Sequence, residues 1–203
     1  MESRATLLKI SVLSAIVFLI ALTDTLMHHG ISNGINPWLT QALWIDPYQH
    51  PIYYDAVKHI TRLGSDGISF LIIVVILGYL AFKRQWLVLC YSIVTLTIIY
   101  GIGAVCKELI NSPRPLFPLE TDSFPSGHTI RASMYCGLLL FLQKIHQIKL
   151  PKITIPLVLL FIPLLVGFTR LALGKHWPSD LIASYALSIG FFSLAIYMNA
   201  RRG

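Results

Sequence analysis

The chain has 203 residues, of which 55% are hydrophobic and only 12% are charged. Soluble domains carry about 25% charged residues, so this composition excludes a soluble globular protein and indicates a chain that lies in a lipid bilayer. The net charge of +7 does not indicate nucleic-acid binding, because most basic residues lie at the ends of apolar runs, as they do in membrane proteins.

Six apolar segments have the length expected of membrane-spanning helices once their flanking residues are included, since a spanning helix needs about 20 residues. We expect an all-α integral membrane bundle that forms a single domain, residues 1–203, with spans at 7–26, 67–82, 86–105, 129–142, 153–173 and 178–198. The first run follows Arg4 and Lys9 and superficially resembles a secretory signal. It is too long for one and lacks an A-x-A cleavage pattern, so we interpret it as a retained span.

The distribution of basic residues predicts the orientation in the membrane. The helix ends on the side of both termini carry nine basic residues and one acid, whereas the opposite ends carry seven basic residues and eight acids. The side richer in Lys and Arg is cytoplasmic. Both termini are therefore expected in the cytoplasm, as an even number of spans also requires.

The loop between the first two spans, residues 28–66, is long enough to contain structure of its own. Within it, Tyr53, Val57 and Ile60 recur at helical spacing, opposite polar side chains. This pattern predicts a short amphipathic helix that lies in the membrane interface. A plain connector and an element that gates substrate access both fit the pattern.

Three polar regions border apolar helices on the predicted outer side, where charged groups are costly and tend to be functional. In the first, Arg114 follows Lys107 by seven residues and precedes Pro115. The planar guanidinium suits phosphate oxygens and the ammonium adds a point charge. Contact with lipid headgroups is the alternative for two basic residues at a helix end.

The second region, Pro125-Ser126-Gly127-His128, comes immediately before the fourth span. Ser126 is expected to cap the helix, and Gly127 would allow a ligand to approach the backbone. A helix N-terminus binds anions, and His128 beside it would donate a proton to a leaving oxygen. A simple cap next to an exposed histidine is the alternative.

The third region contains Arg170, His176 and Asp180. Pro178 fits the first turn of the sixth span, and residues four apart meet across a helix turn. A carboxylate bonded to one ring nitrogen of His176 would fix the tautomer and leave the other nitrogen free to attack. A structural ion pair would produce the same spacing.

Together the three regions resemble the signature of the type 2 phosphatidic acid phosphatase superfamily, K-x6-R-P, P-S-G-H and S-R-x5-H-x3-D. Nine of its ten defined positions match between residues 107 and 180; the exception is Thr169, where the family has serine. The membrane branch of this family has six spans. The resemblance therefore implies an integral membrane enzyme that removes phosphate from a lipid.

The resemblance also implies a role for each matching residue. His176 would be the nucleophile that forms a phosphohistidine, Asp180 would orient it, and His128 would be the general acid and base. The phosphate would be bound by Lys107, Arg114, Ser126, Gly127 and Arg170, with Thr169 as a less certain contact. Because three fixed cations would replace a metal clamp, we expect no metal ion and no other cofactor.

Two further charged residues have open interpretations. Arg131 lies three residues after His128 on one helix face and fits either a headgroup or diphosphate contact, or an ion pair with an outer-loop acid such as Glu120 or Asp122. Asp24, near the outer end of the first span, fits a partner of an active-site cation.

Other functions and substrates remain open at this stage. A transporter also carries intramembrane charges, but the cationic set lies at one interface. A phosphotransferase would use the same phosphohistidine, and a non-catalytic lipid-binding member would not need His176, His128 and Asp180 intact. Relatives act on phosphatidic acid, phosphatidylglycerol phosphate or undecaprenyl diphosphate. We expect a bacterial plasma-membrane enzyme whose active site faces away from the cytoplasm, with no nucleic-acid partner and no obligate protein partner.

Overall fold

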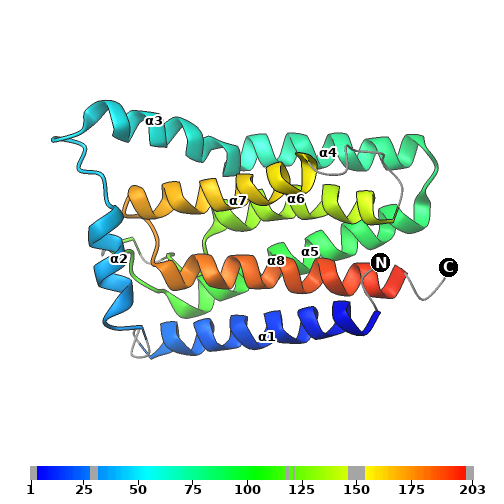
Figure 1. Cartoon of the computed structure of the whole chain (residues 1–203), viewed down its shortest axis with the longest axis horizontal. Coiled ribbons are helices and arrows are strands. Elements are labelled where there is room, and N and C mark those ends of the chain that lie inside the picture. The colour runs from blue at the N-terminus through cyan, green and yellow to red at the C-terminus, as the bar shows by residue number, and fades with distance from the viewer. Residues whose placement is uncertain (1–3, 28–31, 118, 121, 146–153, 200–203) are drawn as a thin grey trace.

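The computed structural model describes residues 4–27, 32–117, 119–120, 122–145 and 154–199. Within them the chain is helical and contains no strand (Figure 1). The elements in chain order are α1 (Arg4–Leu26), α2 (Ile35–Leu43), α3 (Pro51–Thr61), the short 3-10 helix η1 (Arg62–Gly64), α4 (Asp66–Phe82), α5 (Trp86–Ile110), α6 (Gly127–Lys144), α7 (Thr154–Ala172) and α8 (Pro178–Asn199).

The six predicted spans fall on α1, α4, α5, α6, α7 and α8 to within a few residues, although residue 153 lies outside the described residues. Among the described residues, four segments are long and apolar enough to cross a membrane: Arg4–Leu26, Pro51–Phe82, Trp86–Ile110 and Pro178–Asn199. Leu159–Ala172 forms a shorter apolar helix. The molecule therefore has membrane-spanning helices, and the count of six crossings stays a prediction.

The first long loop contains two helices. A helix, α3, covers Tyr53, Val57 and Ile60, where the sequence pattern places one, and Tyr53 is exposed. Its position relative to a membrane interface stays a prediction. The other helix, α2, was not predicted.

The helix ends nearest the predicted polar regions follow from local sequence. Ser126 caps α6, since its side chain accepts a hydrogen bond from the Thr129 N–H, as N-cap serines do. At the end of α5, Asn111 adopts a left-handed conformation. Gly174, with φ +63°, ends the turn after α7, and a Cβ there would lie 2.5 Å from Leu116. Glycine is therefore required both by the backbone angle and by the space.

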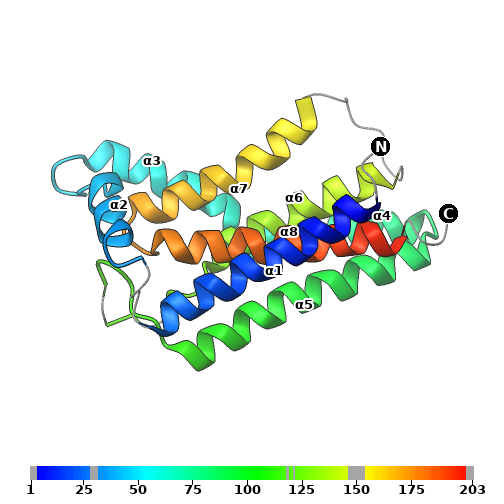
Figure 2. The ribbon, with the colours of Figure 1, turned by 60° about the horizontal axis from the view of Figure 1, so that its bottom comes forward.

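The core is formed mainly by α6 and α8, whose side chains include the fully buried Leu138 and Phe141. α1 lies along α8 (Figure 2). The two approach closely at Gly190, where a Cβ would lie 3.1 Å from Ser14; small residues commonly permit such packing between membrane helices. The outward faces of α1, α4 and α5 expose large apolar side chains, as expected of surfaces that face lipid tails.

The topology collects the predicted polar regions at one end of the bundle. The last turns of α5 and α7 and the first turns of α6 and α8 all lie there, whereas α1 begins and α8 ends at the opposite end (Figure 1).

Candidate active site

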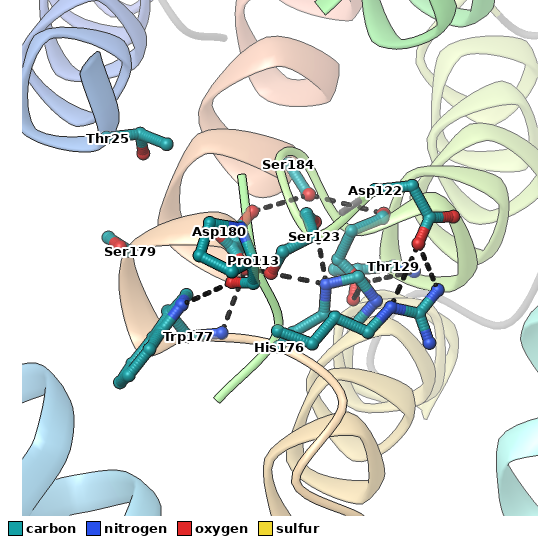
Figure 3. Close-up of polar contacts among 12 residues, drawn as sticks. Thr25, Pro113, Asp122, Ser123, Thr129, His176, Trp177, Ser179, Asp180 and Ser184 are labelled. Carbon is teal, nitrogen blue, oxygen red and sulfur yellow. Dashed lines mark hydrogen bonds and ion pairs between the residues drawn. The ribbon is translucent and has the colours of Figure 1, made fainter. Parts of the chain in front are cut away.

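The three polar regions meet because the segment after α5 crosses the turn between α7 and α8. The Leu116 N–H donates to the Gly174 carbonyl at 3.3 Å. The indole Nε1 of Trp177 donates to the Pro113 carbonyl at 3.0 Å (Figure 3). These bonds place the Lys107–Arg114 region against the His176–Asp180 region, with the start of α6 beside both.

His176 is buried at the centre of this arrangement and is held through Nδ1. That nitrogen lies 2.8 Å from the main-chain carbonyl of Ser123 and 3.4 Å from Oδ2 of Asp180 (Figure 3). Because a carbonyl only accepts, Nδ1 carries the proton and Nε2 has the lone pair. Among the described residues, Nε2 has no hydrogen-bond partner.

The electrostatic environment keeps this imidazole neutral. Burial lowers the pKa of His176 well below its usual range, and the positive charges of Arg170, Lys107 and Arg114 lower it further. A neutral ring retains the lone pair that a nucleophile needs.

Asp180 occupies the third position of α8 and links three groups. Its Oδ2 accepts from the Trp177 N–H at 2.9 Å and from the Ser123 hydroxyl, and it lies beside His176. A carboxylate at this position that bonds back to the N-cap N–H is half of a capping box. The same side chain thus caps α8 and holds the loop that carries Ser123.

The predicted phosphate-binding cations are engaged by two exposed acids. Arg114 donates to Oδ1 of Asp122 at 2.6 and 3.0 Å and forms an ion pair with Glu120 at 2.6 Å. Lys107 Nζ lies 3.6 Å from Asp122 Oδ2, and Lys175 Nζ lies 3.1 Å from Glu120. Burial alone would raise the pKa of Asp122, but the positive charges of Lys107 and Arg114 hold this pKa below its usual range. Lys107 and Arg114 therefore each face a carboxylate before any ligand binds.

Arg170 differs from these two cations because it is buried and its contacts are few. One guanidinium nitrogen donates to the Thr61 hydroxyl at 3.5 Å, and the buried Nε has no hydrogen-bond partner among the described residues. A buried guanidinium N–H without an acceptor is costly unless a ligand supplies one. The neighbouring Thr169 hydroxyl donates to the Val166 carbonyl at 2.6 Å, so its proton is already used within α7.

The start of α6 brings the second region to the same place. A Cβ at Gly127 would lie 3.6 Å from Lys107 Cε and 3.2 Å from an Arg131 nitrogen, so glycine keeps this approach open. His128 follows Gly127 in the first turn of α6. Its Nδ1 is 3.3 Å from Arg131, and because a guanidinium only donates, Nδ1 is the acceptor.

Arg131 and Asp24, whose roles the sequence left open, have partners that the sequence did not indicate. Arg131 forms its ion pair with Asp66, at 3.0 Å, rather than with Glu120 or Asp122, and its Nε donates to the Gly64 carbonyl at 2.9 Å. The physical reason is that the turn before α4 packs against the start of α6. Asp24 accepts from Ser32 through both carboxylate oxygens, at 2.9 and 2.5 Å.

Several residues of the site were missed from sequence. Ser123 contributes through its main-chain carbonyl, which any residue would provide, so its identity carries no signal. Asp122 and Glu120 lie in the loop between α5 and α6 without a recognisable spacing, and the sequence offered them only as partners of Arg131. Only their acidic charge between two cationic regions hinted at a role.

The sequence matches a known protein family and two curated proteins. The family model described as the PAP2 superfamily matches residues 85–203. The chain is 29% identical to phosphatidylglycerophosphatase B of Bacillus subtilis over 157 residues, 72% of this chain and 75% of that protein. It is 30% identical to an undecaprenyl-diphosphatase of Sulfolobus acidocaldarius over 146 residues, 66% and 67% of the two chains.

A solved structure shares the fold. The crystal structure of a transmembrane PAP2-type phosphatidylglycerolphosphate phosphatase from Bacillus subtilis superposes with a TM-score of 0.74 at 23% identity, covering 95% of this chain and 97% of that one. The family match covers more than half of the sequence and includes the three polar regions. This chain therefore belongs to the PAP2 superfamily.

Proposed function

We propose that this protein is a multi-pass membrane lipid phosphatase that works through a phosphohistidine on His176. The observation that carries the proposal is the state of His176: a neutral ring held through Nδ1, with Nε2 unbonded among the described residues and three cations nearby. The PAP2 family match and the names of the curated relatives support a lipid phosphate ester or diphosphate as the substrate class.

In the first step, Nε2 of His176 attacks phosphorus in line as the bond to the lipid oxygen breaks. Lys107, Arg114 and Arg170 would hold the equatorial oxygens, helped by Ser126 and the Gly127 N–H. His128 would protonate the leaving oxygen. This transfer needs the imidazolium form, in which Nδ1 carries a proton and the hydrogen bond from Arg131 is released. The negative charge of the bound phosphate favours that form.

In the second step, His128 accepts a proton from water as the water oxygen attacks the phosphohistidine. The N–P bond breaks, phosphate leaves, and His176 returns to its starting state. The proton on Nδ1 stays with the Ser123 carbonyl and Asp180 throughout, so both groups would stabilise the positive charge of the phosphorylated ring.

The orientation and the origin are part of the same proposal. The polar end of the bundle would face away from the cytoplasm, with both termini on the cytoplasmic side and α3 at the outer interface. Because α1 begins and α8 ends at the end opposite the site, a site that faces outward would put these two helix ends on the cytoplasmic side. We propose a bacterial plasma membrane as the location.

The test is phosphate release by the purified protein in detergent with a chelator present. The substrates would be phosphatidylglycerol phosphate, undecaprenyl diphosphate, phosphatidic acid and a soluble aryl phosphate. We expect release from at least one lipid without added metal, because three cations would supply the charge stabilisation that a metal clamp supplies elsewhere. Strict dependence on Mg²⁺ would contradict this mechanism. Transfer of labelled phosphate to a second lipid, without release, would identify a phosphotransferase.

Removing the carboxylate of Asp122 should strengthen phosphate binding. In Asp122→Asn we expect the inhibition constant for inorganic phosphate to fall about twofold to fivefold, because an exposed ion pair that the phosphate must displace contributes up to about 1 kcal/mol. This constant would be measured from the inhibition of aryl phosphate hydrolysis by inorganic phosphate. Asp55→Asn is the matched control, since Asp55 forms an exposed ion pair with Lys58 in α3. Weaker phosphate binding in Asp122→Asn would instead show that Asp122 holds the cations in place for the ligand.

A further inference from the structure

A small basic hollow borders Arg170, at the place where α3 and η1 pack against the last turns of α7 (Figure 1). Its volume is about 220 Å³. This is several times the about 30 Å³ that one water molecule occupies in the liquid, so a phosphate group fits in it. The polar part of its lining consists of Tyr54, Lys58, Thr61, Arg62, Arg170 and Lys175.

The hollow collects positive charge that its own lining does not balance. Four of the lining residues are cations, and none of the described residues that line it is acidic. Lys58 lies 3.9 Å from Asp55 and Lys175 lies 3.1 Å from Glu120, so each lysine has a carboxylate partner outside the lining. Like charges that surround one hollow repel each other. The arrangement therefore indicates an anion as the group that completes it.

The two arginines of the hollow have no carboxylate partner of this kind. Among the described residues, the Arg62 side chain forms no ion pair or hydrogen bond. Arg170 is only 7% exposed; it donates to the Thr61 hydroxyl at 3.5 Å, and its Nε has no partner in the described part of the chain. Planar guanidinium groups match the oxygens of a phosphate. Two of them around one hollow therefore favour a phosphate group as the anion.

The hollow is distinct from the catalytic phosphate position, although the two share a cation. Lys107, Gly127 and His176 do not line the hollow. Arg170 does, and it is also one of the three cations assigned above to the phosphate that His176 attacks. A phosphate group in the hollow would therefore lie beside the attacked one without taking its place.

We propose that this hollow is a second phosphate site, which binds a phosphate group through Arg62 and the shared Arg170. Lys58 and Arg62 are exposed, so a ligand reaches the hollow from outside the bundle. Two sources offer the same oxygens: the inorganic phosphate that leaves His176, and the headgroup of a second lipid, since α3 is expected at the membrane interface. The first source rests on the proposed function, whereas binding at the hollow does not.

Counting bound phosphate tests the site. His176→Ala would be dialysed to equilibrium against radiolabelled inorganic phosphate in detergent, where no turnover disturbs the count. We expect two phosphates per chain, of which Arg62→Gln in the same background loses one. The loss of a charged hydrogen-bond donor should weaken binding in the hollow about tenfold or more. Arg62→Lys, which keeps the charge but not the planar fork, should have an intermediate effect.

The matched control is Arg84→Gln, because Arg84 is an exposed arginine in the turn between α4 and α5 and does not line the hollow. It should keep both phosphates. An equal loss in Arg62→Gln and Arg84→Gln, or no loss in Arg62→Gln, would overturn the second site. A single bound phosphate that Arg62→Gln removes would support the hollow and contradict the proposed catalytic phosphate position.

Competition by a lipid distinguishes the two sources. The dialysis would be repeated with His176→Ala in nanodiscs of a zwitterionic phospholipid, with and without phosphatidic acid, whose headgroup is a phosphate monoester. Displacement of the Arg62-dependent phosphate by phosphatidic acid would identify a lipid headgroup as the occupant. Its retention would identify free inorganic phosphate. If no phosphate in either nanodisc depended on Arg62, the site would be an effect of detergent and the proposal would be overturned.

Discussion

Replacing His176 with alanine is expected to lower phosphate release by a factor of about 10⁴ or more, because loss of a covalent nucleophile removes the whole two-step pathway. The wild-type ring is neutral, and its Nδ1 is held by Ser123 and Asp180. No other described side chain at the site is a nucleophile held in this way. Release of labelled phosphate from the lipid that the wild type hydrolyses measures the effect. Acid-labile labelling of the wild-type protein during turnover would report the phosphohistidine itself.

The control is a histidine outside the site. His59 of α3 is exposed, so His59→Ala should leave turnover within about twofold, as surface substitutions usually do. Both variants would be checked for wild-type helix content and thermal unfolding in detergent. A His176→Ala protein that is folded and retains more than about 10% of wild-type turnover would rule out the phosphohistidine, because general effects of packing do not replace a nucleophile.

Replacing Asp180 with asparagine is expected to lower kcat by about 10²–10⁴-fold, with KM changed by less than about threefold. Asparagine keeps the shape but removes the charge that stabilises the phosphorylated His176 ring. Ser123 and Trp177 both donate to Oδ2, so the amide oxygen of asparagine can accept from both and the substitution mainly removes the charge. Steady-state kinetics with the lipid and with the soluble aryl phosphate would separate kcat from KM.

A matched control for this change is Asp46→Asn. Asp46 accepts from the Tyr48 N–H at 2.8 Å in the loop before α3, and the amide oxygen of asparagine can still accept it, so the substitution removes a carboxylate charge from a similar short-range bond outside the three polar regions. We expect unchanged kcat for it. If Asp180→Asn also kept wild-type kcat, the Ser123 carbonyl alone would be sufficient to hold the ring, and Asp180 would be only a helix cap.

The sequence predicted the helices of the bundle because their signal is local. Long apolar runs, Pro178 at the start of α8 and Ser126 at the start of α6 each act within a few residues of themselves. The three polar regions were recognisable for a related reason: Arg114, His128 and His176 are rare side chains beside apolar helices, and their types indicate their chemistry. What the sequence did not predict was α2, which is only nine residues long.

The contacts between regions could not be predicted in this way. The exposed acids illustrate it: nothing local pairs Asp122 with both Lys107 and Arg114, or Arg131 with Asp66. Ion pairs form wherever the fold brings opposite charges within a few ångströms, and several acids were equally available to Arg131 on the predicted outer side. Arg131 pairs with Asp66 because the turn before α4 packs against the start of α6.

By itself, the sequence determined the class of protein and the helices of the bundle, and it predicted which side chains would bind and attack a phosphate. Composition and the identity of single residues are enough for these properties. The tertiary structure alone decided that the Ser123 carbonyl holds Nδ1 of His176 and that Asp122 and Glu120 face the cations. Every residue offers a main-chain carbonyl, and every membrane helix has an apolar face. Which of them meet is decided only by how the helices pack.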